Sequence, residues 1–422
     1  MKTSLCGWLL LASLLLSLTG NSALYTLAGA LAWSAGLVLF FTIAPSKRRL
    51  SLTLFTLGTA CFAFAYTMGF RVELWRVLSV NQLMLSLLIS ISYLRLVALP
   101  APSEHPLPKG PKSFVSTFFG VHLFGAIINL SAILLAGDRL SQKAPLSKMQ
   151  IATLSRAFSA DALWSPFFIA FAAASIYAPE ASLLRLWQSG MILVGVGFLL
   201  TYWEFRGKPM EDFVGYPIGP EALVLPALLA ALVGATHWLL PEARVILLVS
   251  FYALGLTLWF LFWRQGIIQG LKHFATHTTT QLPLLKNELA LFLVAGYFGL
   301  SISALLEGFA LAFPVSSFTP TVAAVMLLGM VLVSLVGVHP IISIAILGGW
   351  LGNMEVDHTL LAMTFLMSWS LSIGTSPVSG LNLALSGRYD IPSKKLFLWN
   401  ARYALKLYMA CVVVLLLYEV LI

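Results

Sequence analysis

The chain has 422 residues, of which 59% are hydrophobic and only 10% are charged, whereas ordinary soluble domains contain about 45–50% apolar and about 25% charged residues. This composition excludes a protein whose main solvent is water. The formal net charge of +9 would suggest a nucleic-acid partner in a soluble protein, but Lys and Arg of membrane proteins gather in cytoplasmic loops and orient the chain. We therefore expect a lipid bilayer, and no nucleic acid, around this chain.

The apolar residues form stretches of about 17–25 residues, the length that crosses a ~30 Å hydrocarbon core as a helix. A membrane β-barrel would instead show alternating ten-residue segments. The pattern predicts an all-α polytopic protein of the inner membrane with about eleven transmembrane helices, at 4–20, 23–44, 50–70, 81–99, 113–137, 183–203, 221–240, 245–264, 287–311, 319–351 and 396–421.

The first stretch, 1–20, has Lys2 before an apolar run, as secretory signals do, but we favour an uncleaved extra helix. Cys6, Cys61 and Cys411 all lie within apolar stretches. They indicate neither a disulfide framework nor a zinc site.

Two further apolar regions, 150–179 and 357–392, each contain a Ser-Pro pair. Proline removes a backbone donor and blocks a continuous helix, and in lipid such a break is tolerated only where protein or a water-filled cavity covers the freed backbone. The pairs Ser165-Pro166 and Ser376-Pro377 therefore predict two broken or re-entrant helical regions.

The same landmarks occur twice in the same order, at offsets of 206 to 217 residues between the first three pairs. In the first half they are Asn81, Gly120-Val-His122, Ser165-Pro166, Pro179 and Trp187, and in the second half they are Asn287, Gly337-Val-His339, Ser376-Pro377, Pro392 and Trp399. We interpret the chain as a duplication, with repeat 1 at 21–203, a linker at 204–220 and repeat 2 at 221–422.

Charge indicates that the two copies are inverted. Residues 46–49 are strongly basic and their counterpart, 242–244, is neutral, whereas the next loop is weakly basic at 71–76 and strongly basic at 264–286. Because basic loops stay in the cytoplasm, equivalent loops face opposite sides. One loop argues against this topology, since its basic residues would fall outside: Arg139, Lys143 and Lys148.

Inverted repeats with interrupted helices indicate a midplane binding site in secondary transporters, because broken ends offer N–H groups to anions and carbonyls to Na⁺. The second break supplies such groups, and we predict that substrate or ion binds at Gly374, Thr375, Ser376, Ser379 and Asn382. The alternative is a Pro-kinked helix whose hydroxyls only re-satisfy backbone carbonyls.

The first break contributes Ser159, Asp161 and Ser165 to the predicted site, with Arg156 nearby. Charge at membrane depth is costly, so Arg156 and Asp161 are candidates for a cation or proton site, an anion ligand or a mutual pair. The alternative is that Arg156 snorkels to an interface and Asp161 caps the following half-helix.

Coupling or gating candidates are His122, His339, Pro166, Pro377 and Glu307. The histidines occupy equivalent positions, which favours a structural role over proton coupling. His273 and His277 are four residues apart but lack a third ligand, so no metal site is predicted. The sequence has no Walker-type phosphate loop, so the driving force must be an ion gradient.

Residues 287–308, then 337–340 and 374–387, resemble the second half of the ion transporter superfamily, which includes divalent anion:sodium symporters, arsenite-type permeases and the large membrane subunit of tripartite periplasmic transporters. The resemblance implies a re-entrant hairpin and a broken helix in each half, whose tips bind substrate and Na⁺. The symporters' Ser-Asn-Thr tip motifs are absent here. Ser376, Pro377, Ser379 and Asn382 stand in place of the second, and Ser159, Asp161 and Ser165 in place of the first.

These features predict an elevator-type secondary transporter that takes up small anions or organic acids by symport, with Na⁺ or H⁺ as coupling ion and no other cofactor. The first alternative is the large membrane subunit of a tripartite transporter that depends on a periplasmic binding protein. The second is a membrane-embedded transferase that uses His122, Asp161 or His339 as acid or base, although we expect no enzyme. The sequence leaves a homodimer open.

Overall fold

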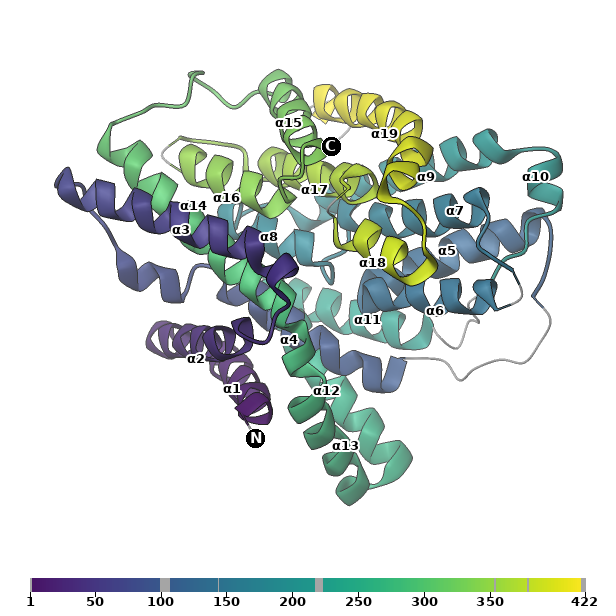
Figure 1. Cartoon of the computed structure of the whole chain (residues 1–422), viewed down its shortest axis with the longest axis horizontal. Helices are drawn as coiled ribbons and strands as arrows, with labels where there is room; N and C mark the ends of the chain where they lie inside the picture. Colours follow the sequence, from purple (N-terminus) through teal and green to yellow (C-terminus); the bar gives the residue numbers. More distant parts are fainter. Residues whose placement is uncertain are drawn as a thin grey trace. The chain divides into compact units, whose positions relative to one another are not determined.

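The computed structural model describes residues 2–98, 107–142, 144–216, 223–352, 354–377 and 379–418, and these residues are mainly helical (Figure 1). One isolated bridge, between Lys109 and Val214, is the only strand pairing among them. The helices are α1 (Lys2–Ser17), α2 (Ser22–Phe40), α3 (Pro45–Thr67), η1 (Leu74–Leu78), α4 (Gln82–Ala98), α5 (Pro111–Ile128), α6 (Leu130–Ser141), α7 (Lys148–Ser159), η2 (Ala160–Leu163), α8 (Ile169–Tyr177), α9 (Leu183–Phe205), α10 (Lys208–Glu211), α11 (Val224–Leu239), α12 (Val245–Gln265), α13 (Ile267–Thr280), η4 (Leu282–Leu285), α14 (Lys286–Gly308), α15 (Pro320–Leu335), α16 (Pro340–Leu351), α17 (His358–Thr375), α18 (Gly380–Tyr389) and α19 (Ser393–Leu416).

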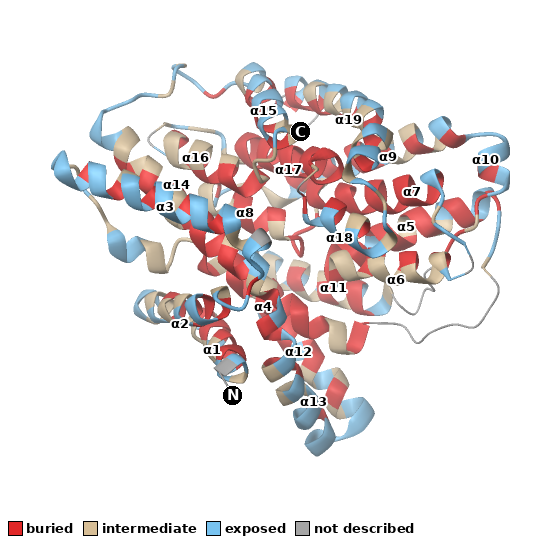
Figure 2. Ribbon diagram, in the orientation of Figure 1, coloured by how far each residue is buried: buried red, intermediate tan, exposed pale blue. Residues whose placement is uncertain are grey.

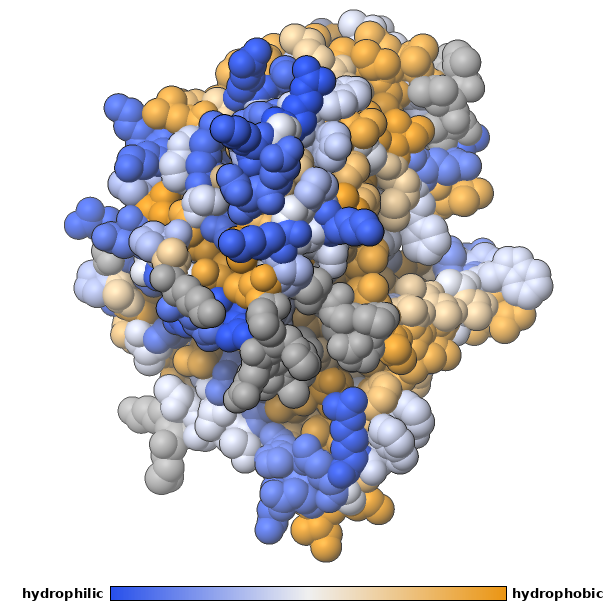
Figure 3. Space-filling view, turned by 90° about the vertical axis from the view of Figure 1, so that its right-hand side faces the viewer, coloured by the Kyte–Doolittle hydropathy of each residue, from blue (hydrophilic) through white to orange (hydrophobic). Residues whose placement is uncertain are grey.

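Eight helical stretches of the described residues are long and apolar enough to cross a membrane, and four shorter helices are similarly apolar. Many large apolar side chains are exposed, such as Val336, Trp238 and Phe41 at 83%, 81% and 76%. Figure 3 shows hydrophobic surface beside hydrophilic areas on one face. Because water would oppose so much exposed apolar surface, the chain is an all-α membrane protein.

The chain forms two compact units, each of which takes segments from both halves of the sequence. Unit 1 comprises Met1–Leu99, Leu228–Ser316 and Ile344–Glu355, and unit 2 comprises Pro100–Ala227, Ser317–Ser343 and Val356–Ile422. The boundaries fall within α11 and α16, so both helices contribute residues to both units.

In unit 1, α14 packs against α2 and α3, α1 against α2, α4 and α13, and α12 against α4. Gly58 brings α3 close to α14, because a Cβ atom at this position would lie 2.8 Å from the Tyr297 ring. Lys286 Nζ donates to the Thr42 carbonyl over 2.8 Å, which fixes the start of α14 beside the turn before α3. Small residues permit such close helix contacts in membranes.

In unit 2, α17 lies at the centre and contacts α7, α8, α9, α15, α18, α19 and η2. Every residue of α17 from Thr359 to Thr375 is buried, and the helix is almost wholly red in Figure 2. An all-round buried helix is expected to be apolar, but this one carries Ser368, Ser370 and Ser372, whose hydroxyl groups have no hydrogen-bond partner among the described residues. Unit 2 therefore buries polar groups at its centre.

Two predicted elements were wrong in detail. The stretch 113–137 is two helices, α5 and α6, because the backbone turns at Asn129 with φ +55°, a region that Asn tolerates better than most residues. The stretch 319–351 is interrupted at Gly337, where φ is +102°, and Pro340 begins α16, since proline suits a first helical turn.

The polar stretch after 264, which lies outside the predicted helices, contains α13. His273 and His277 therefore lie on a helix rather than in a loop, and His277 is buried against the Ser92 hydroxyl at 2.8 Å. Lys143 and the last residues of the predicted linker, 217–220, lie outside the described residues.

Candidate functional site

Both Ser-Pro positions interrupt a helix, as predicted. Helix α7 begins at a capping box, in which Ser147 and Gln150 satisfy each other's backbone N–H groups. It ends at Ser159 and continues through η2 to a break before α8. In the break, Ser165 Oγ accepts from the Phe167 N–H over 3.2 Å and donates to the Ala126 carbonyl over 2.9 Å, so Ser165 holds the unwound backbone against α5.

The second break lies between α17 and α18. Ser376 is extended, as the residue before a proline should be. Ser379 caps α18, since its Oγ accepts from the Asn382 N–H over 3.1 Å and donates to the Ile373 carbonyl over 2.8 Å. Asn382 Nδ2 donates to the Ser376 carbonyl over 2.9 Å and, more weakly, to the Gly374 carbonyl over 3.4 Å. Two side chains thus hold the break closed.

Some polar groups of the second break are not used by the backbone. Thr375 Oγ1 donates to the Leu371 carbonyl, which fits the alternative of hydroxyls that re-satisfy a kinked helix. Ser376 Oγ and Asn382 Oδ1, in contrast, are buried without a hydrogen-bond partner among the described residues. Unpartnered buried oxygens are costly, so these two atoms are available to a ligand.

The two breaks meet inside unit 2. A Cβ atom built on Gly374 would lie 3.8 Å from Ser159 Oγ, which places the end of α17 against the end of α7. Between them lies a cavity of about 10 Å³, close to the lower limit for one water molecule. Its walls include Arg156, Ser159, Ser370, Gly374, Thr375, Asn400 and Tyr403.

Asp161 is wholly buried in η2 and faces His122 of α5. His122 Nδ1 lies 2.7 Å from Asp161 Oδ1 and 3.0 Å from the Ala157 carbonyl oxygen. The Trp164 indole donates to His122 Nε2 over 3.1 Å. Because an indole N–H only donates and a carbonyl only accepts, Nε2 holds a lone pair and Nδ1 holds the single proton. This arrangement therefore contains a neutral imidazole.

The carboxylate of Asp161 contacts one basic side chain, that of His122, and the imidazole is neutral in the arrangement described above. The Nδ1–H of His122 meets hydrogen-bond geometry only toward Ala157, and neither oxygen of Asp161 accepts a hydrogen bond from the described residues. Asp161 Oδ2 also lies against Gly125, where a Cβ atom would be only 2.6 Å away. The second oxygen is therefore enclosed and unpaired.

Gly125→Ala should displace the Asp161 carboxylate, because the added methyl group would also lie 3.2 Å from the Phe158 ring. We expect a loss of about 1–3 kcal/mol in unfolding free energy from overpacking. Thermal unfolding measures it, with Gly195→Ala as the matched control because nothing lies within 4 Å of a Cβ atom there. Equal stability of the two variants would contradict the close contact at Gly125.

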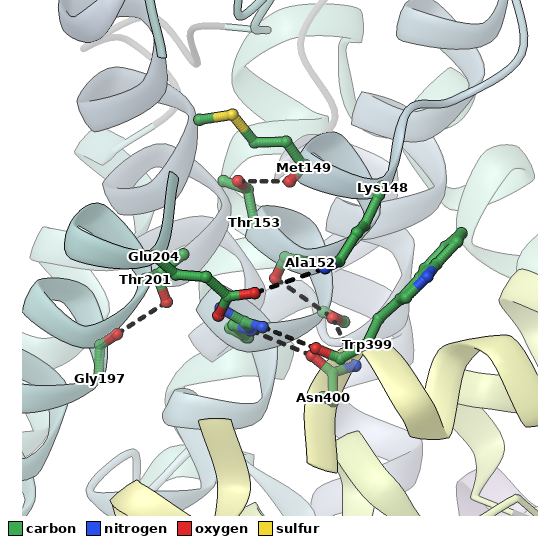
Figure 4. A network of polar contacts seen from close by, with 11 residues as sticks. Lys148, Met149, Ala152, Thr153, Gly197, Thr201, Glu204, Trp399 and Asn400 are labelled. Carbon is green, nitrogen blue, oxygen red and sulfur yellow. Dashed lines mark hydrogen bonds and ion pairs between the residues drawn. The ribbon is translucent and has the colours of Figure 1, made fainter. Parts of the chain in front are cut away.

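Arg156 is buried, and each of its three guanidinium nitrogens donates a hydrogen bond. Nε donates to Asn400 Oδ1 over 3.0 Å, Nη1 to Glu204 Oε2 over 2.8 Å and Nη2 to the Trp399 carbonyl over 2.9 Å. Figure 4 shows the side chains of Glu204 and Asn400 and the backbone carbonyl of Trp399 turned toward one centre, and Lys148 Nζ lies 3.8 Å from Glu204 Oε1. The ring of Tyr403 lies 4.4 Å from the guanidinium carbon.

Of the predictions for Arg156 and Asp161, the mutual pair is wrong, and so is the alternative of a snorkelling arginine and a capping aspartate. Arg156 does not pair with Asp161, because Glu204 is its ion-pair partner. It does not snorkel, since its side chain is 1% exposed. Asp161 does not cap the following half-helix either, because its carboxylate accepts no backbone N–H.

The remaining candidates lie apart from the cavity. His339 Nδ1 accepts from the Ile341 N–H over 3.3 Å and its ring meets Trp369 edge-on at 5.3 Å, so it shapes the start of α16. Pro166 and Pro377 lie at the two breaks. Glu307 belongs to unit 1 and is exposed, so it is not part of the site in unit 2.

No protein-family model matches the chain, and no curated protein matches its sequence significantly.

Proposed function

We propose that the chain is an ion-coupled secondary active transporter of small anions or organic acids in the inner membrane. One observation carries this proposal: two interrupted helices meet within unit 2 at Gly374 and Ser159, and the same two regions contain buried oxygens that lack hydrogen-bond partners among the described residues, namely those of Asp161, Ser376 and Asn382. Interrupted helices at membrane depth are tolerated where they line a binding site. Buried polar groups of native structures usually have a hydrogen-bond partner, so oxygens without one at two helix breaks suit a binding site.

We propose H⁺ as the coupling ion, bound at Asp161. A buried carboxylate without an offsetting charge is very unfavourable, and His122 is neutral in this arrangement. Gly125 and Phe158 enclose Asp161 Oδ2, which leaves little room for a metal cation and its ligands there. A proton needs no cavity and removes the charge completely. Protonation of Asp161 is therefore the binding event that fits the geometry.

We propose that the substrate binds where the two breaks meet. The cavity beside Ser159 and Gly374 is too small for an organic acid, so binding requires that the ends of α7 and α17 separate. The hydroxyl group of Ser370, which has no hydrogen-bond partner among the described residues, and the amide group of Asn400 would then donate to an anion. The charge of Arg156 in the cavity wall is already balanced by Glu204. The substrate is therefore expected to be a small anion that neutral hydrogen-bond donors can hold.

The division of the chain supports elevator-type alternating access. All of the candidate site residues except Glu307 lie in unit 2, so a movement of this unit as one body would carry the complete site across the membrane. The predicted inverted duplication is in keeping with this mode of transport.

Uptake into proteoliposomes tests the function. We expect an imposed pH gradient, acidic outside, to drive accumulation of a labelled small anion, and an imposed Na⁺ gradient at equal pH to have little effect. A panel of inorganic anions and mono- and dicarboxylates identifies the substrate class. Accumulation driven by Na⁺ alone would overturn the assignment of H⁺, and the absence of gradient-driven uptake of every anion would overturn the proposed function.

A further inference from the structure

A second pocket, in unit 1, is lined by four charged side chains of both signs. It has a volume of about 130 Å³, and its walls are Phe62, Arg71, Glu73, Arg76, Leu300, Ser303, Ala304 and Glu307. All of these residues lie in unit 1, so the pocket is independent of the site in unit 2. Two guanidinium groups and two carboxylates in one pocket suit a ligand that itself carries both charges.

The charges of the pocket are only partly paired. Glu73 contacts both arginines, with Arg71 Nη2 at 2.5 Å and Arg76 Nη1 at 3.3 Å. Each guanidinium has five N–H donors, so most of their donors remain available to an anion. The carboxylate of Glu307 has no hydrogen-bond or ion-pair partner within the described ranges, and it is thus the vacant cation acceptor.

The position of Glu307 strengthens this assignment. Glu307 lies in the last turn of α14, where the helix dipole is negative and where cations are favoured over anions. An unpaired acid there is locally unfavourable. A bound ammonium group would interact with both the carboxylate and the end of the helix, so the pocket has one region for an anion and one for a cation.

The pocket lies at one end of a membrane-spanning helix. Helix α3 has 23 residues and is roughly 34 Å long at ~1.5 Å per residue, enough to cross a ~30 Å hydrocarbon core. Lys47, Arg48 and Arg49 lie in its first turns, whereas the pocket is lined by Phe62 near its other end and by Arg71, Glu73 and Arg76 after it. The basic end faces the cytoplasm by the positive-inside rule, which puts the pocket at the outer surface.

Apolar side chains surround the charged groups. Leu74 and Trp75 of η1 are 60% and 61% exposed, and Phe309 packs on Phe70 with ring centroids 4.9 Å apart. Aromatic residues gather at the level of lipid headgroups, and the apolar wall of the pocket, with Phe62 and Leu300, suits acyl chains. A lipid therefore fits this place better than a soluble ligand.

We infer that this pocket binds the headgroup of a phospholipid that carries a phosphate and a primary ammonium group, as phosphatidylethanolamine does. Arg71 and Arg76 hold the phosphate, and Glu307 accepts from the ammonium. A primary ammonium donates up to three hydrogen bonds and a quaternary one donates none, so phosphatidylcholine binds more weakly. Phosphatidylglycerol lacks the cation and leaves Glu307 unpaired.

Lipid titration of the full chain in detergent, followed by native mass spectrometry, tests this inference. The three lipids should have the same acyl chains, with free phosphoethanolamine as a soluble probe. We expect the wild type to bind the ethanolamine lipid about tenfold more tightly than the choline or glycerol lipid, the effect of one charged hydrogen bond. Free phosphoethanolamine should bind more weakly than the lipid.

Two variants test the carboxylate and the guanidinium of the pocket separately. Glu307→Gln should lower the affinity for the ethanolamine lipid about tenfold and leave that for the choline lipid unchanged, whereas Arg76→Gln should weaken both. Matched controls are Glu242→Gln and Arg206→Gln, which change exposed residues outside the pocket. A Glu307→Gln variant with wild-type preference would overturn the inference. Free phosphoethanolamine that binds as tightly as the lipid would also overturn it, in favour of a soluble zwitterion.

Discussion

Asp161→Asn is expected to abolish uptake driven by a pH gradient. Asparagine has the shape of a protonated aspartic acid and cannot release a proton, so the variant resembles the loaded carrier permanently. Its carbonyl oxygen can still lie beside His122 Nδ1, which is 2.7 Å from Asp161 Oδ1. The substitution also removes a carboxylate that is wholly buried beside a neutral imidazole, so we expect stability to be equal or higher.

Exchange transport distinguishes a coupling role from a structural one. If Asp161 carries the proton, the Asn variant should still exchange labelled for unlabelled substrate, because the loaded carrier can cross in both directions, while net accumulation falls to background. Asp390→Asn is the matched control, since Asp390 is exposed and its positive φ of +54° suits Asn equally well. Wild-type accumulation by the Asp161 variant would remove this residue from the mechanism.

The breaks could be predicted from the sequence because their cause is local. Proline ends a helix wherever it falls in the interior, so Ser165-Pro166 and Ser376-Pro377 indicate both interruptions without any knowledge of the fold. The same local chemistry at Asn129 and Gly337 passed unnoticed, since single Asn and Gly residues within apolar runs are weaker signals than Pro. Helix α13 was missed because its sequence is too polar to stand out as an apolar run. Its buried residues include the polar His277.

The partners in the site could not be predicted, because they come from distant parts of the chain. His122 and Asp161 are 39 positions apart, and Arg156 meets Glu204 and Asn400 from two other helices. Asp161, Arg156 and His122 were recognised individually by the cost of placing polar groups in lipid. Trp164, Gly125, Glu204 and Asn400 were missed, although Trp164 stands next to the Ser-Pro pair and Glu204 is an acid at the end of an apolar helix.

Arg156→Gln is expected to cause the largest loss of stability. The substitution leaves Glu204, the Trp399 carbonyl and Asn400 Oδ1 without their donors, and it removes the guanidinium from the Tyr403 ring. Breaking a buried ion pair from one side costs about 3–5 kcal/mol. Glu204 is 31% exposed and can be partly rehydrated, so we expect about 3 kcal/mol, close to the lower limit of that range.

Thermal and denaturant unfolding in detergent measure this loss, and three comparison variants identify its cause. Arg185→Gln is the matched control, because Arg185 is exposed and contacts only Tyr418 among the described residues, so its loss should be within about 0.5 kcal/mol. The double variant Arg156→Gln with Glu204→Gln should recover part of the loss, since the uncompensated carboxylate is then gone.

The variant Arg156→Lys keeps the charge, but a lysine cannot donate to three acceptors in one plane. This variant should therefore remain clearly less stable than the wild type. A lysine variant as stable as the wild type would show that charge alone, rather than the three-way hydrogen bonding, stabilises the junction of α7, α9 and α19.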